Sequence, residues 1–510
     1  MAGGGPAIPG RYWACGLKEC NNRTVSTRLE AMLQGAAGTG PATGHPAGGP
    51  AVPDAGPDPC GAAATARAVV DLEAIAHNAR VLAARAATPW MAVVKADAYG
   101  HGLGPVATTC LDAGATWLGV AQLAEALHLR SLLDRAGIAR PAPGPEALPT
   151  PQAPRLLTWI TPVLSARHAA APGAALRLAL EADLDLSVNS VAQLEAISAA
   201  ARAQGATARI HFKVDTGMSR AGAVAEDLPE LAEAVAQAQG EGVVAMVGLW
   251  SHLSRADEPE SGSTEEHLTR FRAAEEVVRQ AGLRPRIRHL AATGGLLWHP
   301  EARLDLVRAG IGLYGLSPEP ALASSAQLGL RPAMRLEAAL LQVKRIEAGQ
   351  AVSYGGTWSA PTPRWVGLVP LGYSDGIPRA ASSCGPVAVG ALRTTIVGRV
   401  CMDQVVIDLG PATDDHGAPL PAPAQPGDLA VLWGDPAGDR DDVADRPGGQ
   451  VGGGATSAVG SDRGDEGGSA SGGPRRAPVP SADDWALACG TINYEIVTRL
   501  GPRVPRCYAL

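Results

Sequence analysis

The sequence predicts an α/β protein with two parts, an N-terminal barrel of parallel strands and helices and a C-terminal domain made mostly of β-strands. Short apolar runs alternate with amphipathic stretches over roughly residues 90–310. After about residue 330 the helical periodicity gives way to β-branched runs and turns. A chain of 510 residues is also long enough for two domains that each bury a core.

Eight apolar runs in the N-terminal part have the length and composition of buried strands. They are 91–95, 116–120, 156–161, 183–187, 208–213, 243–249, 287–291 and 306–308. Helical stretches at 191–203, 226–239 and 264–282 lie between several of them. This alternation predicts a TIM-like (β/α)8 barrel at 64–329, whose functional residues follow the carboxyl ends of the strands. A Pro-rich insert interrupts it at about 139–154.

The C-terminal part, residues 330–510, carries strand-like runs such as 365–371 and 394–400. Two segments rich in Gly, Ala, Pro, Ser or Asp, 1–63 and about 435–482, have few large apolar residues. Segments of this composition cannot bury enough apolar surface to offset the entropy of ordering. We therefore expect a disordered extension and a disordered insert.

Charge and cysteine spacing exclude several classes of function. The chain has 43 Lys and Arg against 50 Asp and Glu, without a basic stripe, so we expect no nucleic-acid partner. Its eight cysteines contain no CxxC pair, so we expect no metal site. There is neither a membrane-spanning apolar run nor a basic-then-apolar leader, which predicts a cytoplasmic protein with no membrane partner.

Lys95 ends the run 91–95 and precedes a glycine-punctuated turn. Burial disfavours the charged form of a lysine, and a neutral amine is a nucleophile toward an aldehyde. Lys95 is therefore a candidate for Schiff-base chemistry with pyridoxal phosphate. For a lone lysine at a strand end, the alternative is a side chain that only extends to solvent.

The segment Val-Val-Lys-Ala-Asp-Ala-Tyr-Gly-His-Gly around Lys95 resembles the cofactor-lysine motif of the alanine racemases. Further blocks resemble the family in the same order: Lys213-Val-Asp-Thr-Gly-Met-Ser-Arg220, Trp250-Ser-His252, Arg308-Ala-Gly-Ile-Gly-Leu-Tyr-Gly, Ser353-Tyr354-Gly, Leu371-Gly-Tyr373, Met402-Asp403 and Thr491-Ile-Asn-Tyr494. The resemblance runs from about residue 64 to the C-terminus. It implies an isomerase of fold type III that uses pyridoxal 5'-phosphate to interconvert L-alanine and D-alanine for peptidoglycan in the cell wall.

Racemisation needs a proton acceptor on each face of the substrate. The resemblance implies that Lys95 and Tyr354 are these two bases. A phenol has an ordinary pKa of about 10, so Tyr354 needs cationic or hydrogen-bonding neighbours, for which His252 and Arg308 are the candidates. A guanidinium is donor-only, so Arg308 would leave the pyridine nitrogen of the cofactor unprotonated, which favours rapid reprotonation over transamination.

The resemblance also implies the remaining roles. Substrate binding falls to Arg220 and Met402, and Lys213 is the position of a possible carbamylated lysine. The family implies a homodimer in which the C-terminal domain completes the partner's site. The cofactor-binding residues are Lys95, Tyr99, His252, Thr293, Arg308, Gly310, Ile311 and Tyr494, and the supporting residues are His289, Tyr373 and Asp403.

One departure from the family pattern stands out. Where the family usually has His-x-x-Asn-Ser, the chain has His289-Leu-Ala-Ala292-Thr293, which removes an amide side chain near the cofactor. A lost buried hydrogen bond costs about 1 kcal/mol. The alternatives are therefore a weakened or non-catalytic pyridoxal-phosphate-binding paralogue, or another racemase or a decarboxylase of the same barrel class.

Overall fold

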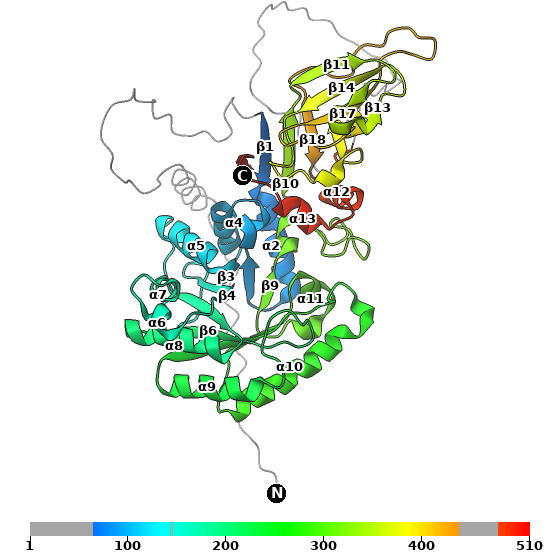
Figure 1. Cartoon of the computed structure of the whole chain (residues 1–510). Helices are drawn as coiled ribbons and strands as arrows, with labels where there is room; N and C mark the ends of the chain where they lie inside the picture. Colours follow the sequence, from blue (N-terminus) through cyan, green and yellow to red (C-terminus); the bar gives the residue numbers. More distant parts are fainter. Residues whose placement is uncertain (1–64, 143, 145, 438–477, 510) are drawn as a thin grey trace, which may run out of the picture.

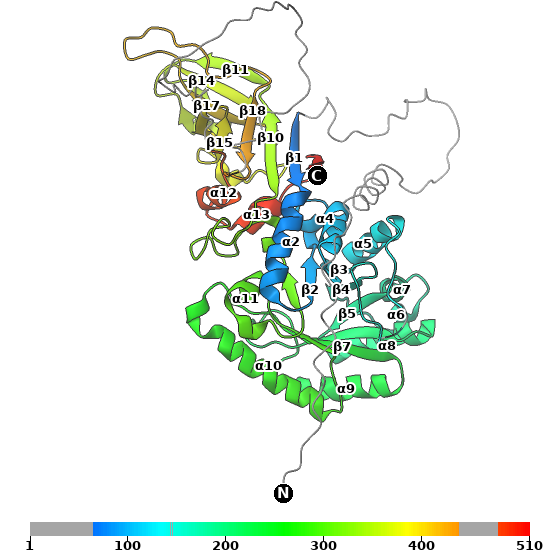
Figure 2. The same cartoon turned by 180° about the vertical axis from the view of Figure 1, so that it is seen from behind.

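A computed structural model of the chain describes residues 65–142, 144, 146–437 and 478–509. The predicted extension 1–63 and residues 438–477 of the predicted insert lie outside the described residues. Figures 1 and 2 show a barrel at the bottom of the view, sheets of the C-terminal part at the top, and β1, β10, α2 and α13 between them.

The barrel is a sheet of eight parallel strands in the order β8-β7-β6-β5-β4-β3-β2-β9. The strands are β2 (Trp90–Val93), β3 (Trp117–Gln122), β4 (Arg155–Ile160), β5 (Leu184–Val188), β6 (Ala208–Lys213), β7 (Val244–Trp250), β8 (Ile287–His289) and β9 (Val307–Ala309). Backbone hydrogen bonds from Asp305 to Arg288 (3.1 Å) and from Arg308 to Ala291 (3.0 Å) join the two edges. The barrel predicted from the sequence is confirmed, with each strand within three residues of its expected bounds.

Helices surround the barrel (Figures 1 and 2). They are α2 (Leu72–Ala86), α4 (Leu103–Asp112), α5 (Leu123–Arg135), α6 (Ala166–Ala170), α7 (Ala175–Glu181), α8 (Val191–Gln204), α9 (Leu228–Gly240), α10 (Ser263–Gln280) and α11 (Thr293–Trp298). The predicted helical stretches correspond to α8, α9 and α10. Every residue of β6 and β7 is buried, as expected for strands between a filled interior and a helical layer.

The Pro-rich insert at 139–154 follows α5 and leads into β4. Arg155, the first residue of β4, donates hydrogen bonds to the carbonyls of Gly144 (3.0 Å) and Ala147 (2.8 Å) in this insert. Glu146 forms an ion pair with Arg286 just before β8. These contacts fasten the insert to the amino-terminal end of the barrel, opposite the strand ends that carry function.

The C-terminal part contains a six-stranded sheet in the order β16-β15-β18-β10-β1-β19, a three-stranded sheet β11-β14-β17, and the pair β12-β13. The strands are β1 (Ala66–Asp71), β10 (Met334–Ala339), β11 (Gln342–Ile346), β12 (Ala351–Val352), β13 (Trp358–Ser359), β14 (Arg364–Val369), β15 (Pro386–Val389), β16 (Leu392–Thr395), β17 (Val405–Pro411), β18 (Leu429–Trp433) and β19 (Arg506–Ala509). The predicted β character of this part is confirmed.

Strand β1 corrects the predicted domain boundary. Residues from 64 onward are predicted to belong to the barrel, whereas β1 pairs antiparallel with β10 and parallel with β19. The chain therefore starts its described part in the C-terminal sheet and enters the barrel only at α2. The pairing partners of β1 lie more than 260 residues away in sequence, so local periodicity could not reveal them.

Two helices of the C-terminal segment, α12 (Ala482–Cys489) and α13 (Asn493–Thr498), return toward the barrel (Figure 1). α13 lies against the turn that follows β2: a Cβ on Gly100 would come within 2.3 Å of the Val497 carbonyl oxygen. Only glycine permits this approach, and Gly100 also has a positive φ of 80°. Within the described residues no helix is long and apolar enough to cross a membrane.

Candidate active site

A cavity of about 280 Å³ lies at the carboxyl ends of the barrel strands. It is lined by Lys95, Tyr99, Lys213, Arg220, His252, Thr293, Arg308, Gly310, Ile311 and Tyr494, together with Trp159, Trp250, Asp257, Ala292 and others. The first ten of these are candidate residues of the sequence analysis. Residues from strands far apart in sequence, and Tyr494 from α13, thus meet in one pocket.

Lys95 opens an unusual turn. Ala96, Asp97 and Ala98 have φ of 52–54° and ψ of 48–53°, and Tyr99 also has a positive φ of 53°, so α3 (Lys95–Tyr99) is a left-handed turn. This conformation costs roughly 1–2 kcal/mol per non-glycine residue. Side-chain carboxylates hold it: Glu125 accepts from the Ala96 amide (2.6 Å) and Asp97 from the Leu103 amide (2.8 Å). The turn fixes Lys95 at the cavity wall.

The amine of Lys95 lies 5.8 Å from the ring centre of Tyr99 and 6.0 Å from that of Trp159. Burial lowers the pKa of Lys95, and the charge of Arg220 lowers it further, whereas the charge of Glu125 opposes the shift. At a given pH, a larger fraction of the Lys95 amine is therefore neutral than in an exposed lysine. Only the neutral amine can act as a nucleophile or a proton acceptor.

Arg308 is buried at the cavity floor, and its guanidinium is held from several sides. It donates to His289 Nδ1 (3.0 Å), His252 Nδ1 (3.0 Å) and the carbonyls of Ser251 (2.9 Å) and Leu290 (2.8 Å). Its guanidinium carbon lies 5.0 Å from the ring centre of Trp250. Burial lowers the pKa of Arg308 to about 9. The cation is thus fixed in place by neutral acceptors.

Lys213, at the end of β6, is a second buried amine in the cavity. Its Nζ lies 4.3 Å from the ring centre of Trp250. Burial, followed by the charges of Arg308 and Arg220, lowers the pKa of Lys213 to about 8. A substantial neutral fraction near pH 8 makes this amine reactive as well.

The cavity is strongly cationic. Lys95, Lys213, Arg220 and Arg308 line it against one carboxylate, Asp257. The arrangement favours a small ligand that carries several negative charges. The described residues contain no cluster of histidine, cysteine and carboxylate side chains that could hold a metal ion.

One wall of the cavity is rich in hydrogen-bond donors. Thr293 Oγ1 accepts from the amide of Gly310 (3.0 Å) and more weakly from that of Gly312 (3.5 Å). Ile311 opens the short helix η3 (Ile311–Tyr314), whose first amides have no acceptor within the helix. A Cβ on Gly310 would come within 2.9 Å of Tyr99 Oη. This wall of amides and hydroxyls suits a phosphate group.

Five candidate residues do not line this cavity. His289 is buried beneath it, behind Arg308. Tyr354, Tyr373 and Met402 are 72%, 42% and 52% exposed, and the exposed Asp403 pairs with Arg503. These last four belong to the C-terminal domain.

Tyr354, Tyr373 and Met402 form one exposed patch. Ser353 Oγ donates to the carbonyl of Arg399 (2.7 Å), which ties the turn η4 (Tyr354–Gly356) to the segment before Met402. The amide of Tyr373 donates to the Cys401 carbonyl (3.0 Å). The strand β13, which pairs with β12 just before Tyr354, lies at the end of the molecule opposite the barrel in Figure 1. None of the three residues of the patch lines the cavity of its own chain.

The departure at Ala292 lies in the cavity wall. Ala292 precedes α11 and provides no side-chain hydrogen bond to its amides. Sequence reasoning missed other residues of the site, notably Trp159, Trp250 and Glu125. Trp250 had a signal in the sequence, since it directly follows the strand-like run 243–249 and lies in the same block as His252. Glu125 had none, because it bonds to a residue 29 positions away in the sequence.

Residues 70–318 match the family described as "Alanine racemase, N-terminal domain", and residues 333–449 match "Alanine racemase, C-terminal domain". The chain belongs to the alanine racemase family. It is 45% identical over 444 residues to the alanine racemase of Beutenbergia cavernae, covering 87% of this chain and 97% of that protein. The alanine racemase of Salinispora tropica is 43% identical over 440 residues, with coverage of 86% and 97%.

Solved structures of the family have the same fold. The alanine racemase of Streptomyces coelicolor A3(2) aligns with a TM-score of 0.70 at 41% identity, over 87% of this chain and 98% of that chain. The enzyme of the D-cycloserine producer Streptomyces lavendulae aligns with a TM-score of 0.70 at 40% identity, over 88% and 97%. The resemblance found in the motifs thus extends over nearly the whole length of these relatives.

Proposed function

We propose that the protein is an alanine racemase that uses pyridoxal 5'-phosphate to interconvert L-alanine and D-alanine. The observation that carries the proposal is the partly buried Lys95 amine of lowered pKa in the same cationic cavity as Arg308. The established family and the catalytic motifs along both domains support it. We also infer that the reaction takes place in the cytoplasm and supplies D-alanine for peptidoglycan.

The cavity fits this cofactor. Lys95 offers the amine for its aldehyde, and Tyr99, Thr293, Ile311, Gly310 and Tyr494 offer hydroxyls and amides for its phosphate. Arg308 offers a permanent donor to its ring nitrogen. When bound, pyridoxal phosphate acidifies the α-proton of an amino acid by delocalising the negative charge into its ring.

Two bases would then move the proton. Lys95 accepts and returns it on one face, and its lowered pKa brings the amine closer to the operating pH. Tyr354 serves the other face, and because it is exposed in its own chain, we infer that it reaches the cavity of a second copy. The working unit in this proposal is a homodimer with shared active sites.

The remaining candidates have binding roles in the proposal. Arg220, at the cavity mouth, pairs with the substrate carboxylate, and Met402 of the second copy adds its backbone amide. Lys213 is the proposed carbamylation position, where a pKa of about 8 leaves a reactive neutral amine. His252 and Arg308 bind the cofactor, and His289, Tyr373 and Asp403 support these residues. The barrel, which begins at α2, and the β domain that β1 joins divide these roles.

The experiment is an L-to-D alanine assay with the protein loaded with pyridoxal phosphate. We expect racemisation in both directions and its loss in Lys95→Ala, whereas Lys344→Ala, at an exposed lysine, should keep full activity. Borohydride reduction followed by peptide mapping should place the pyridoxyl group on Lys95. A label on Lys213, or cofactor binding without racemisation, would contradict the proposal, and the second result would favour the non-catalytic paralogue.

A further inference from the structure

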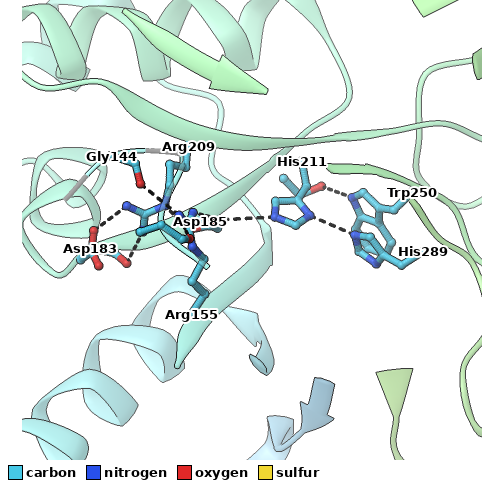
Figure 3. Close-up of polar contacts among 10 residues, drawn as sticks. Gly144, Arg155, Asp183, Asp185, Arg209, His211, Trp250 and His289 are labelled. Atoms are coloured by element: carbon cyan, nitrogen blue, oxygen red, sulfur yellow. Dashed lines mark hydrogen bonds and ion pairs between the residues drawn. The ribbon is translucent and has the colours of Figure 1, made fainter. Parts of the chain in front are cut away.

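A line of buried polar side chains connects Arg308 to a carboxylate in the barrel interior, and Figure 3 shows its part from His289 through His211 to Asp185. His289 Nε2 lies 2.9 Å from His211 Nδ1, and His211 Nε2 lies 3.2 Å from Asp185 Oδ2. With the bond from Arg308 to His289 Nδ1 (3.0 Å), this makes a continuous chain across β9, β8, β6 and β5. All four side chains are at most 3% exposed.

The two ends of the chain fix the direction of every hydrogen bond. Arg308 has only donors, so His289 Nδ1 must accept and the proton of a neutral His289 resides on Nε2. His289 Nε2 then donates to His211 Nδ1, which leaves the His211 proton on Nε2. That proton is donated to Asp185, an acceptor when ionised.

Asp185 is held as the ionised end. Arg209 Nε donates to its Oδ1 (2.6 Å), and Arg155 Nη1 lies 3.4 Å from its Oδ2. Burial alone would raise the pKa of Asp185, but the charge of Arg209, the bond from His211 and the charge of Arg155 lower it overall. Burial lowers the pKa of both histidines, so a neutral form suits each.

A specific irregularity in the sheet makes room for this chain. The register of β6 and β7 shifts between Ile210 and His211, so that His211 pairs with Gly248. A Cβ on Gly248 would come within 2.3 Å of His211 Nδ1, the atom that accepts from His289. Bulges near functional sites commonly re-aim a side chain, and this one aims His211 at His289.

Aromatic rings shield the chain from water. The rings of Trp250 and His289 are stacked, with centroids 5.4 Å apart and an interplanar angle of 3°. Trp117 contacts His211 edge to face at 5.3 Å. In such surroundings the aligned imidazole dipoles act on Arg308 with little screening. Among the described residues no carboxylate lies within ion-pair distance of Arg308. The hydrogen bonds through His211 and His289 therefore connect Arg308 to the negative charge of Asp185.

We propose that Asp185, His211 and His289 form a one-directional hydrogen-bond relay that keeps Arg308 charged and oriented at the cavity floor. These three are positioning residues, because they act through Arg308 and do not line the cavity. The relay presents the acceptor face of each imidazole toward Arg308, so neither histidine can become an imidazolium without losing a bond. His289 Nδ1 therefore stays unprotonated and can accept the hydrogen bond from the Arg308 guanidinium.

The first test reads the protons directly. In the ¹⁵N-histidine-labelled holoenzyme, His211 and His289 should both give NMR signals of the neutral Nε2–H tautomer, unchanged between pH 6 and about pH 9. An Nδ1–H tautomer or an imidazolium at either position overturns the proposal. This measurement does not depend on racemisation. The proposed relay can therefore fail while the proposed function stands, and the proposed function can fail while the relay stands.

The second test compares substitutions at His211, and it rests on the proposed function. Glutamine can accept from His289 and donate to Asp185, whereas methionine has no donor and only a weakly accepting thioether. We expect His211→Met to lower kcat roughly 10- to 100-fold, with a smaller effect on KM, and to shift the cofactor absorbance. Losses of this size are typical at metal sites when a residue that hydrogen-bonds to a metal ligand is removed. His211→Gln should recover most of the loss.

Two further variants complete the test. Gly248→Ala changes the identity of no relay residue, but its methyl group would displace the His211 side chain, so it should reproduce the His211→Met effect. Thr158→Val is the matched control: Thr158 is equally buried in the barrel, on β4, and its hydroxyl donates to the Ala121 carbonyl (3.1 Å), outside the relay. It should leave kcat and the cofactor absorbance unchanged. A normal kcat and spectrum in folded His211→Met would overturn the relay.

Discussion

Lys95, Lys213 and Arg308 occupy the same cavity, yet the structure treats their charges differently. Burial lowers the pKa of all three groups, but only Arg308, whose pKa stays at about 9, has four hydrogen-bond acceptors around it. An amine that loses its proton easily is useful as a base, and a guanidinium that keeps it is useful as a permanent donor. The guanidinium starts from a much higher ordinary pKa than an amine, and its four acceptors fix its orientation.

At the residue scale the sharpest prediction concerns Tyr354→Phe. We expect the variant to keep the cofactor and a near-normal absorbance spectrum, while racemisation falls roughly 10²- to 10⁴-fold, the usual contribution of a general base. Solvent deuterium should still enter the α-position of D-alanine, which Lys95 serves, but hardly that of L-alanine. Mass spectrometry of the two enantiomers measures this exchange. Equal, near-normal exchange into both would exclude Tyr354 as the second base.

Much of the candidate site could be predicted from the sequence because its residues belong to contiguous motifs. Lys95 with Tyr99, and Lys213 with Arg220, lie in single blocks, and the cavity contains all four. Asp185 and His211 could not be predicted in this way. Each lies inside an ordinary apolar strand, and their connection depends on strand order and on a one-residue bulge.

At the scale of elements, the strands and helices of the barrel were predictable because each has its own periodicity. The left-handed turn of α3 was not, because Ala96, Asp97 and Ala98 have no intrinsic preference for positive φ. Long-range contacts impose it: the carboxylate of Glu125 accepts from the amides of Ala96, Ala121 and Gln122. One side chain thus links the turn to the start of α5.

This arrangement predicts that Glu125→Ala destabilises the fold by about 1–3 kcal/mol, because three backbone donors lose their acceptor. Glu73→Ala is the matched control. Glu73 lies on α2 in an exposed ion pair with Arg80, and its loss should cost less than about 0.5 kcal/mol. Denaturant unfolding of the two variants measures the difference. Equal stability of Glu125→Ala and the unsubstituted protein would show that the turn does not need this carboxylate.

At the scale of the whole molecule, the structure separates the proposed bases. Lys95 is in the barrel cavity, and Tyr354 lies on the exposed patch of the C-terminal domain with Tyr373 and Met402. Large apolar side chains gathered at a surface are typical of a protein interface. We therefore expect two copies to pack so that each patch closes the other's cavity, an isologous contact between identical chains.

Subunit complementation between Lys95→Ala and Tyr354→Phe tests most directly whether two copies of the chain share a two-base site. Each variant alone should be nearly inactive. After subunit exchange in an equal mixture, half of the dimers are mixed, and each mixed dimer has one cavity with both Lys95 and Tyr354. Racemisation should therefore recover to about one quarter of the unsubstituted activity, as two-fold symmetry requires. No recovery after confirmed subunit exchange would contradict a two-base site shared between two copies of this chain.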